Sequence, residues 1–316
     1  MENLLLFRGN EFNANFFHHA KIDVDHSFYL KCGKKEILIV PKLNERVARY
    51  LFSGTVLCNE KPLDEIIRLM KGKELALDYS SLPAKIYEKL VKIIKTRNFS
   101  EKFLKFRAAK KPEELEKIKK AVSLTKKIFS LIEISEFKDE KSLNDWLHIR
   151  TFELGTKPAF DPIVCSGIHS TFPHYKPSHS RIKNFILVDY GVKYENYCSD
   201  ITRMFFTSRE KKVSDSYEII QSIFYEIIDE FPNFENGGEV ALFSEKLFKK
   251  YRLPKPMHSI GHGVGLDIHE YPRLNKKYKD EIKGTVMAVE PAAYFRDFGV
   301  RFEETIYFDG KKVKIL

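Results

Sequence analysis

The fold of this chain is decided by the stretch FILVDYGVKYENYCSDITRMFF, residues 185–206. Two apolar segments flank a polar centre, a pattern typical of a hairpin of two buried β-strands. If the turn is centred between Tyr194 and Glu195, Asp189 lies directly opposite Asp200, with Cβ atoms about 5 Å apart. Buried carboxylates this close repel each other, and a bound cation would relieve the repulsion. Taken alone, the stretch is equally compatible with two strand-end aspartates that face solvent.

A second motif follows in HSIGHGVGLDIHE, residues 258–270. It contains three histidines, His258, His262 and His269, and three glycines that let the backbone approach a ligand closely. Neutral imidazole suits a transition metal, and neighbouring imidazoles can polarise a substrate or carry protons. A lone histidine is more often structural, but a cluster of this density predicts a functional site.

Two glutamates form a third motif. Glu290 follows the apolar run 286–289 and precedes Pro291, so it is expected at a strand end. Glu303 lies inside a β-like run, where a glutamate by itself is usually exposed. Together the three motifs supply four carboxylates and one neutral imidazole, a set that two divalent cations would neutralise: Asp189, Asp200, His262, Glu290 and Glu303.

This carboxylate-rich set favours particular metals. It suits Mn²⁺, Co²⁺ or Fe²⁺, with Zn²⁺ as a further candidate. Two such ions about 3.5–4 Å apart can hold a bridging hydroxide and polarise a carbonyl. The predicted cofactor is therefore a pair of divalent metal ions per chain, with Mn²⁺ or Co²⁺ foremost.

Length and composition set the broad class. The chain has 316 residues, which predicts two domains. The formal net charge is +10, but lysine and arginine are interleaved with aspartate and glutamate, so neither a nucleic-acid nor a membrane partner is expected. The four cysteines form no CxxC pair, the first residues are too quickly polar for a signal peptide, and no apolar run reaches the roughly 20 residues that span a bilayer. A reduced, cytoplasmic protein is expected.

The expected domains are residues 1–109 and 110–316. The first alternates short apolar and helix-like segments and is expected to be a small α/β domain, with strands at 27–31, 36–40, 55–58, 74–78 and Phe103–Phe106. In the second, one helix is expected to begin at Pro112 and another at Ser142, and the later part is expected to be mainly strands and turns. The predicted fold class is α/β, in the wider sense of a mixed α+β fold.

The order of the motifs resembles that of the pita-bread metallopeptidases. Ten residues separate the two aspartates, and GHGxG, Glu-Pro and Arg-x-Glu follow in turn. This family includes methionine aminopeptidase, Xaa-Pro aminopeptidase and Xaa-Pro dipeptidase, also called prolidase. The resemblance spans about residues 105–316, and the part before it is similar to the small creatinase-type domain of the proline-specific branch.

Several details resemble the proline-specific branch in particular. The segments 160–167 and 172–174 are similar to its substrate-side loop, His258 matches a histidine of that branch, and Arg301 belongs to its Arg-x-Glu motif. Two features depart from the family pattern. Tyr175 stands where glycine is usual, and Ala292-Ala293 stand where glycine and an aliphatic residue are usual. Both departures are expected near the substrate pocket.

The resemblance implies a role for each site residue. Asp189 would bind one metal, Asp200 and Glu303 would bridge both, and His262 would complete one of them. Glu290 would bind beside His262 and accept the proton of the bridging water. His269 would stabilise the oxyanion, and His174 and His258 would contact the substrate or its proline side. Arg301 would support Glu303 or the substrate carboxylate.

The implied function is hydrolysis of Xaa-Pro peptide bonds by attack of the metal-bridged hydroxide. A Xaa-Pro dipeptidase that acts on short proline-containing peptides is favoured, with Xaa-Pro aminopeptidase as the alternative. Methionine aminopeptidase and a pita-bread binding protein without catalysis stay open as further alternatives. The resemblance also implies a homodimer.

Overall fold

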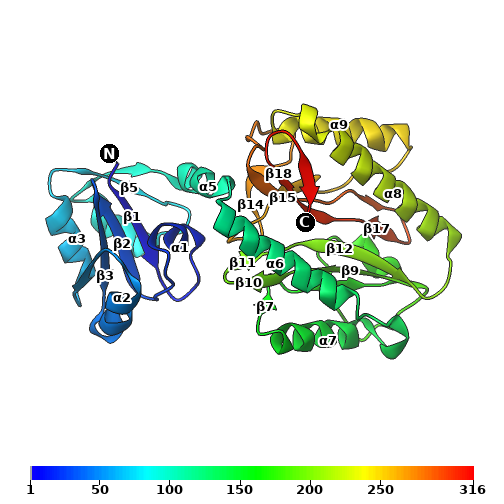
Figure 1. Ribbon diagram of the computed structural model, residues 1–316, viewed down its shortest axis with the longest axis horizontal. Helices are drawn as coiled ribbons and strands as arrows, with labels where there is room; N and C mark the ends of the chain where they lie inside the picture. Colours follow the sequence, from blue (N-terminus) through cyan, green and yellow to red (C-terminus); the bar gives the residue numbers. More distant parts are fainter. Residues whose placement is uncertain (1) are drawn as a thin grey trace. The chain divides into compact units, whose positions relative to one another are not determined.

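The computed structural model describes residues 2–316, and the chain divides into two compact units after Arg107. The first unit comprises residues up to 107, and the second comprises residues 108–316. Both units contain helices and strands, as the predicted mixed α/β fold class requires (Figure 1).

The first unit is built on one six-stranded sheet. Its strands are β1 (Leu4–Arg8), β2 (Ser27–Cys32), β3 (Lys35–Val40), β4 (Thr55–Cys58), β5 (Glu74–Leu77) and β6 (Lys95–Asn98). They lie in the order β4-β3-β2-β1-β5-β6, with β1 antiparallel to β2 and parallel to β5. The helices are α1 (Ala14–Ala20), α2 (Glu45–Leu51), α3 (Pro62–Met70), α4 (Ala84–Val91) and α5 (Ser100–Ala108).

Alternating side chains give this sheet two hydrophobic faces. Leu4 and Leu6 of β1 belong to the core that contains Phe103 of α5. Leu5 belongs to the opposite core, which contains Ile66 of α3. The first unit is therefore a three-layer sandwich with helices on both faces of the sheet (Figure 1).

One predicted strand of the first unit is wrong. Phe103–Phe106 lies in the helix α5. Phe103 and Arg107, four residues apart, are buried, whereas Phe106 is 45% exposed, so burial follows the helical period. The other four predicted strands match β2 to β5 within one residue, while the sequence patterns did not indicate β1, β6 or α1.

The second unit carries four long helices and several short strands. The helices are α6 (Pro112–Phe129), α7 (Glu140–Glu153), α8 (Lys211–Glu230) and α9 (Gly237–Lys250). The strands are β7 (Lys157–Pro158), β8 (Ile163–Cys165), β9 (Phe185–Tyr190), β10 (Val192–Tyr194), β11 (Tyr197–Cys198), β12 (Ile201–Phe206), β13 (Gly261–Gly263), β14 (Glu270–Arg273), β15 (Thr285–Val289), β16 (Ala292–Tyr294), β17 (Gly299–Arg301), β18 (Glu304–Phe308) and β19 (Val313–Ile315).

These strands form small antiparallel sheets. The sheet orders are β12-β9-β8, β14-β13-β15-β18-β19, β11-β10-β7 and β16-β17. An isolated bridge between Thr202 and Glu303 joins the first two of these sheets. Ile220 and Phe224 of α8 pack with Ile306 of β18 in the core, and α6 packs against β10 and β11 (Figure 1).

The predicted hairpin forms, but its register differs from the prediction by two residues. Asp189 of β9 faces Thr202 of β12. The turn is made by Glu195 and Asn196, whose φ angles are 45° and 71°. Two successive positive φ angles give the turn that fits the twist of a two-residue hairpin, and asparagine tolerates this conformation. Asp200 is therefore a diagonal neighbour of Asp189, not its direct partner.

The helix α7 begins two residues before the predicted start at Ser142. Asp139 is its N-cap, and the Asp139 Oδ1 atom accepts a hydrogen bond of 2.7 Å from the Ser142 backbone N–H. The Ser142 hydroxyl accepts one of 3.2 Å from the Asp139 N–H in return. Ser142 thus completes a capping box from inside the helix.

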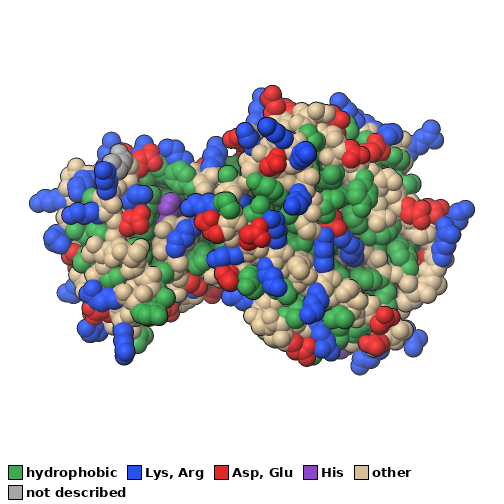
Figure 2. Space-filling view, in the orientation of Figure 1, with side chains coloured by type: hydrophobic (Ala, Val, Ile, Leu, Met, Phe, Trp, Pro, Cys, Tyr) green, Lys and Arg blue, Asp and Glu red, His purple; other side chains and the backbone are tan. Residues whose placement is uncertain are grey.

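One face of the molecule is mixed in charge. On the face shown in Figure 2, lysine and arginine side chains are scattered among aspartate, glutamate and uncharged groups. Among residues 2–316, no helix combines the length and the apolar character needed to span a bilayer.

Candidate metal centre and active site

One cavity of about 710 Å³ in the second unit contains every site residue that the sequence predicts. Apolar and proline side chains from residues 160–163 and 173–177 line it together with these polar groups. Cavities of this size with a few convergent polar groups are typical of ligand sites. The predicted residues that line it are His174, Asp189, Asp200, His258, His262, His269, Glu290, Arg301 and Glu303.

The five predicted metal ligands lie in strands or beside strand ends. Asp189 is near the end of β9, and Asp200 directly precedes β12. His262 is the central residue of β13. Glu290 directly follows β15, and Glu303 directly precedes β18. Residues that are distant in sequence therefore line one cavity.

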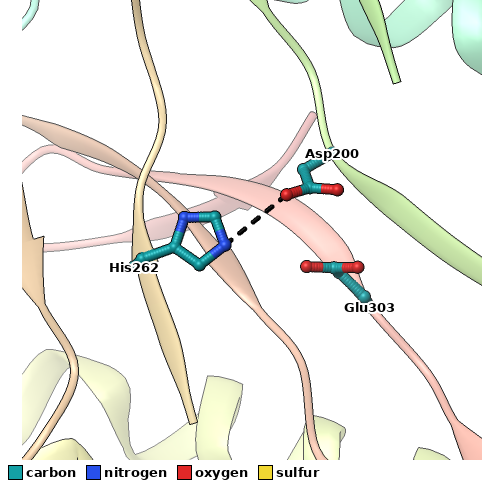
Figure 3. Close-up of side chains that lie close together, drawn as sticks. All are labelled: Asp200, His262 and Glu303. Atoms are coloured by element: carbon teal, nitrogen blue, oxygen red, sulfur yellow. Dashed lines mark ion pairs between the residues drawn. The ribbon is translucent and has the colours of Figure 1, made fainter. Parts of the chain in front are cut away.

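Three of the five form the tightest group. The candidate ligand atoms of Asp200, His262 and Glu303 lie within 4.8 Å of one another (Figure 3). His262 Nε2 is 3.5 Å from Asp200 Oδ2 and 3.9 Å from Glu290 Oε1. The imidazole therefore directs one nitrogen toward two carboxylates.

The tautomer of His262 follows from its other nitrogen. Nδ1 lies 3.1 Å from the carbonyl oxygen of Gly263, which can only accept, so Nδ1 carries the proton. Burial, assisted by the neighbouring His269, lowers the pKa of His262 to about 3, so the ring is neutral. Nε2 then offers a lone pair toward the carboxylates, as a metal ligand must.

The carboxylates of the cavity lack sufficient positive partners. Burial, and then Glu303, Asp189 and Glu290, raise the pKa of Asp200 well above its ordinary value. Burial and then Asp189 raise the pKa of Glu303 to about 8. The Oδ1 atoms of Asp189 and Asp200 are buried without any hydrogen-bond donor. A divalent cation would supply the missing partner, so the residues present fit a metal centre.

Two threonines hold these carboxylates in place. The Thr202 hydroxyl donates a hydrogen bond of 2.6 Å to Glu303 Oε2. The Thr305 hydroxyl donates to the Asp200 carbonyl oxygen at 2.7 Å and accepts from the Asp200 N–H at 3.1 Å. Sequence reasoning missed both residues, although Thr202 lies only two positions after Asp200 on the quoted stretch.

Arg301 is the buried cation of the site. Its Nη2 atom donates to Asp189 Oδ2 at 2.7 Å, and its Nε atom donates to the Thr202 hydroxyl at 3.2 Å. Because Thr202 in turn bonds Glu303, Arg301 supports Glu303 through that hydroxyl. Its direct ion pair is with Asp189, a contact that the sequence did not indicate.

His258 is linked to a tyrosine that sequence reasoning also missed. His258 Nδ1 donates to the Ser259 carbonyl oxygen at 2.8 Å, so Nε2 accepts from the Tyr294 hydroxyl at 2.9 Å. Burial lowers the pKa of His258 to about 4 and raises the pKa of Tyr294 to about 12. Arg301 Nη1 also donates to the Tyr294 oxygen at 3.4 Å, which ties His258 to the same network. No motif pointed to Tyr294.

His269 and His174 lie on the solvent-accessible part of the cavity, and both are exposed. The His269 ring centroid is 4.2 Å from that of His262. Burial of part of the ring lowers the pKa of His269, so its ordinary state is neutral. A neutral imidazole that lines the cavity next to the candidate metal centre can donate a hydrogen bond to a substrate.

The two departures from the family pattern lie in different places. Tyr175 lines the cavity, and its ring stacks on His169 with a centroid distance of 4.4 Å. Ala292 and Ala293 of β16 are fully buried, and neither is among the described residues that line the cavity. Only Tyr175 can therefore contact a substrate directly.

Comparison with known proteins decides the family. The sequence model of the metallopeptidase family M24 matches residues 116–309 of this chain. The chain belongs to metallopeptidase family M24. An uncharacterised peptidase of Methanocaldococcus jannaschii is 32% identical over 281 residues, which cover 84% of this chain and 78% of that protein.

Two further relatives of this M24 chain carry more specific names. A Xaa-Pro dipeptidase of Pyrococcus horikoshii is 30% identical over 293 residues, or 88% of this chain and 83% of that protein. The solved structure of prolidase from Pyrococcus furiosus is similar with a TM-score of 0.88 at 26% identity, over 100% of this chain and 96% of that one. The resemblance to the pita-bread metallopeptidases is confirmed. Membership in family M24 makes the chain a hydrolase and implies the use of divalent metal.

Proposed function

We propose that this M24 chain is a Xaa-Pro dipeptidase with a dinuclear metal centre. The observation that carries the proposal is a cavity lined by one neutral imidazole and four carboxylates, three of them buried, in which two carboxylate oxygens lack any donor. The names of the dipeptidase and prolidase relatives support the choice of substrate.

The metal would be held by the five residues predicted from the sequence. Four carboxylates and one neutral histidine balance two divalent ions, which favours Mn²⁺ or Co²⁺, with Fe²⁺ and Zn²⁺ as further candidates. When bound, such ions activate water and polarise a peptide carbonyl. The proposed ligands are Asp189, Asp200, His262, Glu290 and Glu303.

Glu290 is the proposed proton carrier. Its Oε1 atom lies 3.9 Å from His262 Nε2, and its Oε2 atom lies 3.4 Å from His258 Nδ1. Burial raises the pKa of Glu290 well above its ordinary value, which makes this carboxylate a stronger base. Glu290 would accept a proton from the attacking water and return it to the proline nitrogen as the peptide bond breaks.

The other polar residues would orient the substrate. His269 would donate a hydrogen bond to the developing oxyanion. His174 and His258 would contact the proline side of the peptide. Arg301 would fix Asp189 by its 2.7 Å ion pair and Glu303 through Thr202.

Xaa-Pro aminopeptidase is the second candidate. The observation that favours it is the size of the cavity, because about 710 Å³ leaves room for residues beyond a dipeptide. Methionine aminopeptidase and a binding protein without catalysis are weaker, since two of the relatives compared above are named Xaa-Pro dipeptidase and prolidase and all five candidate ligands line one cavity.

The proposal extends to the whole chain. We assign residues 1–109 to a creatinase-type domain and residues 110–316 to the pita-bread catalytic domain, supported by the division after Arg107. A homodimer and a cytoplasmic location are part of the proposal. The four free cysteines, two of them buried, support a reducing compartment.

A substrate panel tests the proposal. Leu-Pro, Leu-Pro-Gly and Met-Gly-Met are offered to protein stripped with a chelator, with and without added Mn²⁺ or Co²⁺. The dipeptidase reading predicts metal-restored cleavage of Leu-Pro alone. Cleavage of Leu-Pro-Gly would favour the aminopeptidase, and cleavage of Met-Gly-Met alone would favour methionine aminopeptidase. Two bound ions with no cleavage of any peptide would contradict the proposed substrate class.

A further inference from the structure

Glu140 is a buried carboxylate outside the cavity that sequence reasoning did not single out. Its side chain is 0% exposed, and it is the first residue of α7. A buried carboxylate is costly unless hydrogen-bond donors surround it, so the donors around Glu140 identify what it holds.

The two carboxylate oxygens of Glu140 bind opposite ends of one segment. Oε1 accepts hydrogen bonds of 2.9 Å from the Ser166 N–H and 2.9 Å from His169 Nδ1. Oε2 accepts one of 3.1 Å from the Ser178 hydroxyl and one of 3.4 Å from the Ser178 N–H. Backbone bonds from Glu140 to Ser180 and from Lys141 to Ser178, of 3.1 Å and 2.9 Å, reinforce the second attachment.

The segment between these attachments forms part of the cavity. Residues 173–177 line it, and they include His174 and the unusual Tyr175. The Tyr175 ring stacks on His169 at an interplanar angle of 19°, and its hydroxyl is 2.8 Å from the Ser178 hydroxyl. Tyr175 thus connects both residues whose side chains bind Glu140 directly.

The chemistry of this contact requires a carboxylate. Four donors converge on two oxygens, and each oxygen of an ionised glutamate accepts at least two hydrogen bonds. Glutamine has the same shape, but it would place an amide NH₂ against a pair of donors. The substitution Glu140→Gln therefore breaks the hydrogen bonds to one end of the segment, and it creates no empty space because the two side chains have the same size.

We propose that Glu140 is a positioning residue that fixes the substrate-side segment, residues 169–178, and through it the placement of His174. The meaning of the segment as substrate-side rests on the proposed function. The fixation itself rests only on the four contacts of Glu140 and on the stacking of Tyr175. Tyr175, in place of the usual glycine, makes the segment a rigid aromatic wall of the cavity.

The primary test measures order without any substrate. Hydrogen exchange of the amides in residues 169–178 is compared in wild type, Glu140→Gln and the control Glu153→Gln. Glu153 lies on the same helix, but it is surface-exposed and pairs with Arg150. Loss of charge-assisted hydrogen bonds predicts exchange about 10- to 100-fold faster in Glu140→Gln only. Unchanged exchange in the segment would overturn the proposal, whatever the protein cleaves.

Kinetics then test the path through His174. Glu140→Gln is expected to raise KM for Leu-Pro about 10-fold with metal content unchanged. In a double-mutant cycle, Glu140→Gln should add less than about 2-fold to the KM of His174→Ala. Fully additive losses would show a general structural role and overturn the positioning role.

A second variant keeps the proposal testable if Glu140→Gln does not fold. Ser178→Ala removes only the hydroxyl donor to Oε2 and is measured in the same way, with a smaller rise in exchange expected. If the exchange rises as predicted but wild type does not cleave Leu-Pro, the fixation by Glu140 stands and the proposed function fails. If Leu-Pro is cleaved but exchange is unchanged, the proposed function stands and the fixation by Glu140 fails.

Discussion

Two groups of buried carboxylates in the second unit differ in their partners. Glu140 receives four hydrogen bonds, and Glu270 accepts one of 2.6 Å from Lys110 Nζ, in a pair whose side chains are 1–2% exposed. In the cavity, by contrast, the Oδ1 atoms of Asp189 and Asp200 receive none.

This difference in hydrogen-bond partners indicates which carboxylates have a structural role and which have a functional role. When the chain itself supplies the partner of a buried carboxylate, removing that partner should destabilise the fold, because it removes a compensating group from a buried charge. A buried carboxylate that the chain leaves without a partner requires a ligand. Substituting such a carboxylate should leave the fold intact but abolish binding of the ligand.

Asp200→Asn should have the largest effect, and it should be on function. Metal-dependent hydrolysis of Leu-Pro is expected to fall at least about 10³-fold, because a metal ion contributes several kcal/mol to the transition state. The unfolding midpoint of the metal-free variant should equal or exceed that of wild type, since one repelling charge is gone. Steady-state kinetics and thermal unfolding measure both. Asp215→Asn, at a side chain that is 44% exposed and lies outside the cavity, is the matched control. Normal turnover with full metal content in Asp200→Asn would refute the ligand assignment.

Lys110→Met should have the opposite signature. It removes the buried ammonium group that donates to Glu270 at 2.6 Å, so the free energy of unfolding is expected to fall by about 3–5 kcal/mol. Folded protein should still bind metal. Urea unfolding measures the change, and Lys141→Met, in an exposed pair with Asp145, should cost no more than about 0.5 kcal/mol. Equal losses of unfolding free energy in Lys110→Met and Lys141→Met would contradict a structural role for the buried Glu270 carboxylate.

His269→Ala tests a cavity residue that is not a proposed ligand. Loss of the oxyanion donor should lower kcat by about 10²- to 10³-fold. Metal content, measured by elemental analysis, should stay at the wild-type value. A variant that purifies without metal would mean that His269 is a ligand and that its assigned role is wrong.

The stability of metal-free protein should depend on pH in a particular direction. The pKa of Glu303 is raised from 4.5 to about 8, so the folded state binds a proton that the unfolded state releases. This contribution is complete below about pH 4.5 and is lost as pH rises through about 8, so the unfolding midpoint should fall over that range. Added Mn²⁺, or Glu303→Gln, should flatten the profile, whereas a midpoint that rises with pH would contradict the repulsion described here.

The candidate metal ligands could be proposed from sequence because each of them belongs to one of three short motifs whose order resembles that of a known family. The quoted hairpin, the GHGVG motif and Glu290 are local signals, and the structure brings their side chains into one cavity. The register of the hairpin could not be found in this way, because the positive φ angles of Glu195 and Asn196 decide where the turn lies.

The residues that sequence reasoning missed act through distant contacts. Thr202 bonds Glu303 across 101 positions, and Tyr294 bonds His258 across 36. Glu140 bonds Ser178 across 38. None of them has a local pattern that differs from an ordinary helix or strand residue, so only the folded chain identifies their partners. The prediction of a strand at Phe103–Phe106 was wrong for a related reason, because the pattern of a short apolar segment of four residues does not distinguish a strand from one helical turn.

The central claim is that the unsatisfied carboxylates form a dinuclear metal centre. Calorimetric titration of chelator-stripped protein with Mn²⁺ tests it directly, without relying on any substrate. We expect saturation at two ions per chain, with the second site lost in Asp200→Asn. Saturation at no ion, or a wild-type stoichiometry in Asp200→Asn, would contradict it.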